Sequence, residues 1–202
     1  GVVPHDTCAS TLLSAEGLLY VNTSNGLDAR HASVPRPDAP TLVALDLRTG
    51  RLVAKDGERI GRRLLHGNWS SPSFGRVNGE GRIFLGGGDG RLYAFQPPLP
   101  AGPGCGVQTL RNIWSTDANP PHFRTRDGAA LPYSAWNRRL ADGPSELIGS
   151  PVVDRGRVYV AIGQSPLHGL GAGCLTCVDA ATGAVLWRSE ALNRTLSTVA
   201  LH

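Results

Sequence analysis

The sequence contains no methionine among its 202 residues, and only 6% of its residues are aromatic. It also lacks any apolar run close to the 18 residues that a membrane-spanning helix needs, so no transmembrane segment is expected. No stretch of a dozen residues combines the i, i+3, i+4 apolar spacing of a helix with freedom from glycine and proline. With 26 glycines and 15 prolines, the chain is predicted to be a turn-dense, all-β protein.

Several functional signatures are absent as well. No Ser–His–Asp spacing, paired-carboxylate motif or HExxH motif occurs, so we assign no catalytic residue. The glycine-rich segment Gly86–Gly90 joins two expected strands and opens no helix, which indicates a hairpin turn, with Asp89 as a turn residue. The net charge is +4, but the arginines that carry it are scattered and form no contiguous basic stripe. We therefore expect no nucleic-acid partner.

What the sequence does contain is a strand–turn–strand pattern that occurs twice, at Thr41–Ala54 and at Leu175–Trp187. In both copies apolar residues alternate up to an aspartate, a short turn ends in Thr-Gly, and a second apolar run follows. Alternation with period two is typical of a half-buried strand, and Asp-x-x-Thr-Gly is typical of a turn. The landmark residues are Asp46 and Gly50 in the first copy, and Asp179, Gly183 and Trp187 in the second.

A second pattern, a serine-led apolar run followed by a glycine-led apolar run, precedes these copies. It opens at Ser10, Ser71 and Ser150 and begins again at Ser197. The intervals between the serines are 61, 79 and 47 residues. Removing the excess of 14 residues in the segment Thr23–Pro40 brings the first interval from 61 to 47. Without such loops each unit has roughly 40–45 residues, the period of a four-stranded propeller blade.

The sequence therefore predicts an open arc of about three four-stranded antiparallel blades and the first strand of a fourth. All belong to one partial β-propeller domain spanning residues 1–202, with innermost strands near Leu12, Ser73 and Val152. Because three blades do not close a ring, we expect a fragment of a longer protein of about seven or eight blades. The blades are expected at about 8–56, 68–117 and 147–190, and the next one begins at 194–202.

The Ala-x-Asp-x-x-Thr-Gly-x-x-x-Trp pattern resembles the tryptophan-docking motif of the pyrroloquinoline quinone (PQQ) type β-propellers. That family includes quinoprotein alcohol dehydrogenases and the non-catalytic lipoprotein of the outer-membrane assembly machinery. Four segments are similar to one branch of it, the secreted bacterial PQQ-binding-like β-propeller repeat proteins. They are His66–Pro72, Gly86–Phe95, Val158–Gln164 and Arg194–His202.

The resemblance implies a periplasmic or secreted protein that acts as a binding or scaffolding module. The alternative that it implies is part of a PQQ-dependent quinoprotein oxidoreductase acting on an alcohol or a sugar. In that case PQQ with Ca²⁺ would be the cofactor, but the calcium ligands of the family match no carboxylate here residue by residue. The adjacent cysteine pair of the dehydrogenases is also missing from this sequence.

In the family the docking tryptophan packs flat between adjacent blades, so Trp187 is expected to be largely buried. Ala54 stands at that position in the first unit and implies a looser contact with more space around it. Trp114 follows the inserted segment Pro97–Thr109 and is not expected to be in register with Trp187.

The chain has four cysteines, and two of them form a CxxC motif at the start of an expected strand. Residues three apart on a strand point to opposite faces, which is awkward for a disulfide or a shared metal. Buried structural thiols, a disulfide and a metal site all stay open as alternatives. The residues concerned are Cys8, Cys105, Cys174 and Cys177.

Four long loops are expected to project from one face of the arc, where function tends to gather on a rigid scaffold. They are Thr23–Pro40, Asp56–Asn68, Asp117–Leu147 and Gly163–Gly173. We expect this face to bind a small molecule, a glycan or a protein, with imidazoles that hydrogen-bond the ligand or hold a metal. The predicted site residues are His31, His66, Asn68, Trp69 and His168.

Overall fold

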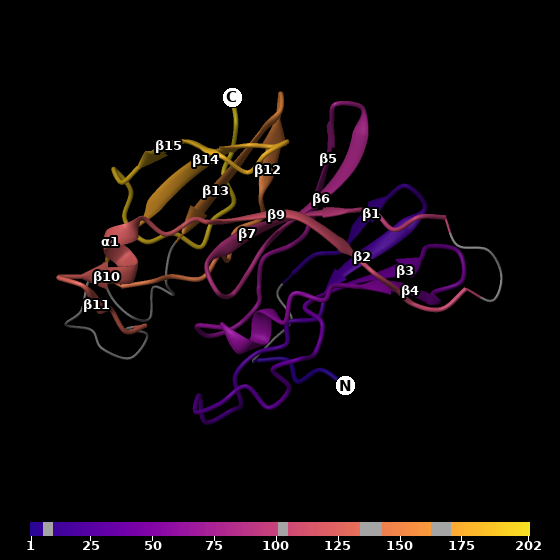
Figure 1. Ribbon diagram of the computed structural model, residues 1–202, viewed down its shortest axis with the longest axis horizontal. Coiled ribbons are helices and arrows are strands. Elements are labelled where there is room, and N and C mark those ends of the chain that lie inside the picture. Colours follow the sequence, from indigo (N-terminus) through magenta and orange to yellow (C-terminus); the bar gives the residue numbers. More distant parts are fainter. Residues whose placement is uncertain (6–9, 101–104, 134–142, 163–170) are drawn as a thin grey trace.

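The computed structural model describes residues 1–5, 10–100, 105–133, 143–162 and 171–202. Three main sheets follow one another along the chain and lie side by side in Figure 1. The first contains β1 (Leu13–Ala15), β2 (Leu18–Asn22), β3 (Leu42–Asp46), β4 (Leu52–Lys55) and β8 (Gln108–Thr109), in that order. The second contains β5 (Ser73–Val77), β6 (Glu80–Gly86), β7 (Arg91–Gln96) and β9 (Arg111–Asp117). The third contains β12 (Val152–Asp154), β13 (Arg157–Ile162), β14 (Cys174–Asp179) and β15 (Val185–Ser189).

The remaining elements lie in the connections. They are the 3₁₀ helix η1 (Ile60–Arg62), the helix α1 (Pro121–Arg124) and a small hairpin of β10 (Thr125–Arg126) and β11 (Ala129–Ala130). Among the described residues, neither helix is long or apolar enough to cross a membrane.

The predicted all-β arc of four-stranded antiparallel blades is confirmed. The strand β5 contacts both β1 and β12, so the first strand of each sheet is the innermost one, as expected. Residues 194–202 form no strand with any described part of the chain. This segment runs past the start of the third sheet, where Ser150 N donates to Thr198 Oγ1 at 3.0 Å.

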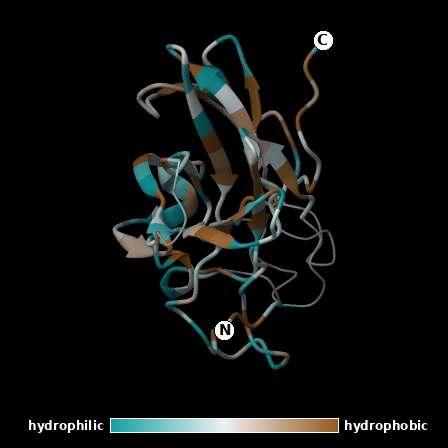
Figure 2. Ribbon diagram, turned by 90° about the vertical axis from the view of Figure 1, so that its right-hand side faces the viewer, coloured by the Kyte–Doolittle hydropathy of each residue, from teal (hydrophilic) through white to brown (hydrophobic). Residues whose placement is uncertain are grey.

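The middle sheet is buried on both faces because neighbouring side chains of β6 point in opposite directions. Ile83 and Leu85 pack with Tyr20 and Leu42 of the first sheet. Phe84, which lies between them in sequence, packs with residues of the third sheet. Two separate cores therefore hold the three sheets together, and Figure 2 shows hydrophilic and hydrophobic residues alternating along several strands.

The register of the sheets corrects the prediction for Trp114. Trp114 lies opposite Ala94, as Trp187 lies opposite Cys177, and a bulge follows at the same place in both sheets. The inserted segment before β9 therefore does not displace Trp114, because it is accommodated as a loop before the strand resumes pairing.

Trp114 makes the inter-sheet contact that was expected of Trp187. Its Nε1 donates to Ala180 O at 3.1 Å, and its ring lies so close to Gly183 that a Cβ there would come within 2.5 Å of it. Trp187 is 41% exposed, so its predicted burial is wrong for this chain. The physical reason is that β15 is the outermost strand of the last sheet, and no described sheet follows to cover it.

The prediction of a looser contact at Ala54 is also wrong. Ala54 is fully buried, because β8 runs parallel to β4 and pairs with it at Ala54–Gln108 and Lys55–Thr109. The segment inserted into the second unit thus adds a fifth strand to the first sheet. This strand covers the outer edge of the first sheet, at the position where the docking motif has a tryptophan and this chain has Ala54.

Both Thr-Gly turns have the predicted chemistry. Asp46 Oδ1 accepts hydrogen bonds from Thr49 N and Oγ1 at 2.8 and 2.6 Å. Asp179 Oδ1 accepts the same two bonds from Thr182, at 2.8 and 2.9 Å. These bonds lower the pKa of each aspartate, since they favour the ionised form. Each turn ends in a glycine at positive φ, 70° at Gly50 and 73° at Gly183, where other residues are strained.

The cysteines Cys174 and Cys177 are free and buried on β14, and Cys105 is free and exposed. Burial raises the pKa of the thiols of Cys174 and Cys177, which makes them poor nucleophiles. Of the three alternatives for the CxxC motif, the structure supports buried thiols. Cys8 lies outside the described residues.

Candidate functional site

Two of the predicted site histidines meet on the long-loop side of the arc. His31 Nδ1 lies 3.0 Å from His66 Nε2, although the two residues come from different loops. A third histidine that was not predicted, His5, places its Nε2 2.9 Å from the same His66 nitrogen. One ring nitrogen from each histidine lies within 4.8 Å of the others. The expected proximity of His31 and His66 is therefore confirmed.

Burial differs among the three rings. His5 is 1% exposed and His66 is 5% exposed, whereas His31 is half-buried and closes the cluster toward solvent. We call His5, His31 and His66, with the adjacent Trp69 and Tyr133, the histidine face.

The repeat pattern of the sequence already contained a signal for His5. His5 precedes Ser10 by five residues, and His66 precedes Ser71 by the same number. Both histidines thus lie on the segment that enters a blade. Sequence reasoning missed His5 because it compared the strands of the units and not the segments that lead into them.

A buried relay continues from the second nitrogen of His66. His66 Nδ1 lies 3.1 Å from Tyr133 Oη, and the Tyr133 hydroxyl donates to Glu146 Oε1 at 2.9 Å. Glu146 is fully buried, and burial raises the pKa of its carboxyl group to about 7. Burial likewise raises the pKa of the Tyr133 hydroxyl above its usual range. Neither residue was singled out from the sequence, because only the folded chain brings them to His66.

Trp69 forms one wall of the face, as predicted. Its ring centroid lies 5.1 Å from that of His66 and 5.9 Å from that of His5. Asn68 has a different place, since it is fully buried and its amide bonds the backbone. Its Nδ2 donates to Asn25 O at 2.7 Å, and its Oδ1 accepts from Gly88 N at 2.8 Å. Asn68 therefore braces the loops behind the face.

The position of His31 depends on a tight loop built around Asp28. Asp28 Oδ1 accepts from Arg30 N and Ala32 N at 3.0 and 2.9 Å, and its Oδ2 accepts from Ser33 Oγ at 2.9 Å. These bonds lower the pKa of Asp28. Within this loop His31 has a φ of 56°, a left-handed conformation that is costly for a residue with a side chain. The loop thus holds His31 in a conformation it would rarely adopt alone.

Another loop histidine, His122, does not join the cluster. His122 lies on α1, where its Nε2 is 3.0 Å from Glu190 Oε2. His168 lies outside the described residues, so its predicted place beside His31 and His66 stays a prediction.

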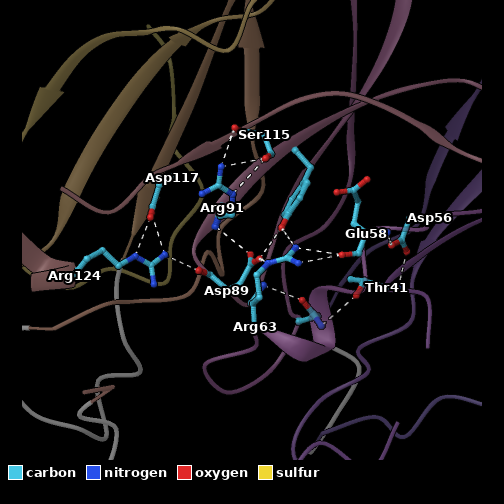
Figure 3. A network of polar contacts seen from close by, with 12 residues as sticks. Thr41, Asp56, Glu58, Arg63, Asp89, Arg91, Ser115, Asp117 and Arg124 are labelled. Atoms are coloured by element: carbon cyan, nitrogen blue, oxygen red, sulfur yellow. Dashed lines mark hydrogen bonds and ion pairs between the residues drawn. The ribbon is translucent and has the colours of Figure 1, made fainter. Parts of the chain in front are cut away.

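A separate polar network, shown in Figure 3, ties the loops to the middle sheet. Asp89, which is 2% exposed, accepts from Tyr93 Oη at 2.6 Å and from Arg63 Nε at 3.2 Å. Arg124 donates to Asp89 O at 2.7 Å and pairs with Asp117 at 2.9 Å. Asp89 is thus the expected turn residue. The network links the loop after η1, the β6–β7 turn and α1, and so supports the scaffold beneath the long loops.

The histidine face offers imidazole nitrogens, a phenol and an indole ring in one place. Imidazoles donate or accept directional hydrogen bonds and are ligands for transition metals. An indole provides an apolar surface for stacking. This set can hold a small polar ligand or a metal ion.

A family model described as outer membrane protein assembly factor BamB matches residues 111–201. No curated protein sequence matches the chain.

A quinohemoprotein alcohol dehydrogenase, ADHIIG from Pseudomonas putida HK5, superposes with a TM-score of 0.53 and 22% identity. The match covers 92% of this chain and 21% of that one, so the chain spans about a fifth of its length. A europium-containing methanol dehydrogenase has a TM-score of 0.46 and 14% identity, over 88% of this chain and 24% of that one. BamB from Moraxella catarrhalis has a TM-score of 0.42 and 14% identity, over 90% and 51%.

Proposed function

We propose that this chain is a PQQ-like β-propeller repeat protein and that it acts outside the cytoplasm as a binding module. Its ligand docks on the histidine face. The extracytoplasmic location rests on kinship with the PQQ-like propellers, and the position of the site rests on the geometry of the loops.

One observation carries the proposal. His5, His31 and His66 are far apart in sequence but place ring nitrogens within 4.8 Å of one another. Converging polar groups beside an aromatic wall are typical of a ligand site on a rigid scaffold. The loop around Asp28 supports the same view, since it keeps His31 in a left-handed conformation.

The alternative function is that of a piece of a PQQ-dependent oxidoreductase. The histidine face does not fit the calcium ion of that cofactor, because Ca²⁺ takes six to eight oxygen ligands and this cluster offers ring nitrogens. We therefore derive no quinone chemistry from these residues. The experiment below includes PQQ so that this alternative is tested directly.

The test is a thermal-shift measurement on the full-length protein with three separate probes: zinc chloride, PQQ with calcium chloride, and a neutral oligosaccharide. A ligand that binds only the folded protein, present at 100 times its Kd, stabilises it by about 2.7 kcal/mol. For a domain of 150–250 residues that corresponds to a rise in Tm of about 5–10 °C, and for a longer protein the rise is smaller. We expect at least one probe to produce such a rise.

The matched variant is the double substitution His66→Ala, Trp69→Ala, which removes the centre and the wall of the face. It should abolish the rise in Tm while leaving the sheet signal in circular dichroism unchanged. A rise that persists in this variant contradicts the proposed site, and the absence of any rise contradicts the proposed function. If PQQ with calcium chloride is the only probe that raises Tm, the oxidoreductase function is favoured.

A further inference from the structure

The hydrogen bonds around His5 fix which of its nitrogens carries the proton. His5 Nδ1 lies 2.9 Å from Leu27 O. A carbonyl oxygen only accepts hydrogen bonds, so Nδ1 is the donor and carries the hydrogen. In the neutral ring, Nε2 then presents a lone pair, and this lone pair is directed at His66.

The hydrogen bonds of Tyr133 and Glu146 likewise determine which nitrogen of His66 carries the hydrogen. When Glu146 is ionised, the Tyr133 hydroxyl donates to its carboxylate. The Tyr133 oxygen is then the acceptor for His66 Nδ1–H at 3.1 Å. His66 Nε2 is left with its lone pair, which faces the lone pair of His5 Nε2 at 2.9 Å.

Two lone pairs at this distance repel each other unless a positive charge lies between them. A proton on one nitrogen would bridge a single pair of rings. The structure, however, gathers three nitrogens, because His31 Nδ1 also lies 3.0 Å from His66 Nε2. A metal ion bonds all three at once and also suits the tautomers of His5 and His66, since histidine ligands usually donate their other nitrogen to a carbonyl or a side chain.

On these grounds we propose that His5 Nε2, His31 Nδ1 and His66 Nε2 bind one divalent transition-metal ion of the zinc class. This identifies the ligand of the histidine face and so rests on the proposed function. The donor type selects the metal: imidazole suits zinc, copper and nickel, whereas Ca²⁺ and Mg²⁺ take oxygen ligands.

The dimensions fit this class of ion. Zinc–nitrogen bonds of about 2.0–2.1 Å in a tetrahedral site place neighbouring nitrogens about 3.3 Å apart. The separations in the cluster are 2.9 and 3.0 Å, and all three atoms lie within 4.8 Å. The two separations from His66 Nε2 are thus within about 0.4 Å of the spacing that a shared zinc ion requires. Tyr133 and Glu146 are positioning residues, because they set the orientation and tautomer of His66 without touching the ion.

The experiment is a calorimetric titration of the metal-free, full-length protein at pH 8 with zinc chloride. We expect one zinc ion per chain and no binding of calcium or magnesium chloride at the same concentration. His31→Gln should weaken zinc binding by more than the 10–100-fold loss that is typical of changes in the surroundings of a metal ligand. Because His31 is only half-buried, this variant is expected to fold.

Tyr133→Phe should weaken zinc binding about 10–100-fold, since it breaks the relay but keeps the ring. The matched control is His122→Gln, which changes a 61% exposed histidine outside the cluster and should bind zinc like the wild type. Unchanged binding in His31→Gln overturns the three-histidine site. If the wild type binds no zinc, yet another probe gives a thermal shift that depends on His66, then the metal is wrong and the binding face stands. If no probe depends on His66, both proposals fail.

Discussion

Replacing Trp114 with alanine is expected to lower the free energy of unfolding by about 3–5 kcal/mol. The ring packs against Gly183 in the turn of the neighbouring sheet, and its Nε1 donates to Ala180 O. Alanine would leave a cavity between the second and third sheets and remove this hydrogen bond. Urea denaturation of the full-length protein measures the effect as a lower transition midpoint at unchanged slope.

Two matched variants show how much of this loss comes from the hydrogen bond and how much from packing between the sheets. Trp114→Phe keeps an aromatic ring but loses the hydrogen bond, so it should cost about 1 kcal/mol plus a smaller packing loss. Trp187→Ala changes the same register position in the last sheet, where the ring is 41% exposed. If the chain carries no covering sheet there, this variant should cost much less than Trp114→Ala. A loss below about 1 kcal/mol for Trp114→Ala would show that Trp114 does not join the sheets as described.

The second large effect concerns Glu146 and pH. Burial raises the pKa of this carboxyl group from 4.5 to about 7, so the folded state binds its proton more tightly than the unfolded state does. The resulting stabilisation is complete below about pH 4.5 and is lost as pH rises through 7. The shift of roughly 2.5 pKa units corresponds to about 3 kcal/mol.

Glu146→Gln removes this titration, because the amide is neutral at every pH. In the metal-free protein, the variant should therefore gain stability relative to the wild type as pH rises from 4.5 to 8, by up to about 3 kcal/mol. Chemical denaturation of both proteins at four pH values measures the difference. Parallel stability curves for the two proteins would contradict a raised pKa for Glu146.

Much of the fold could be predicted because each blade repeats local chemistry. The Asp-x-x-Thr-Gly turns at Asp46 and Asp179 depend on contacts three residues apart, which the sequence displays directly. The burial of Ala54 could not be predicted in this way. It depends on β8, a strand that the chain supplies from a different unit. Trp114 was misjudged because the length of an inserted loop carries no information on where pairing resumes.

The site was predicted in part for a similar reason. Loop length and blade geometry sufficed to bring His31 and His66 together, since neighbouring blades place equivalent loops side by side. Tyr133 and Glu146 belong to a loop without a repeated pattern, so nothing in the sequence linked them to His66. Asn68 stands next to the face in sequence, but its amide is fully used in bracing the backbone.

The central claim is that three imidazoles hold one metal ion on the loop face of a propeller. X-ray absorption at the zinc K-edge of the zinc-loaded, full-length protein tests it most directly. Our account predicts a shell with three imidazole nitrogens at about 2.0–2.1 Å, including the outer-ring scattering that identifies histidine. The count of imidazoles should fall to two in His31→Gln. A shell of oxygen atoms alone, or an unchanged count in that variant, would contradict the account.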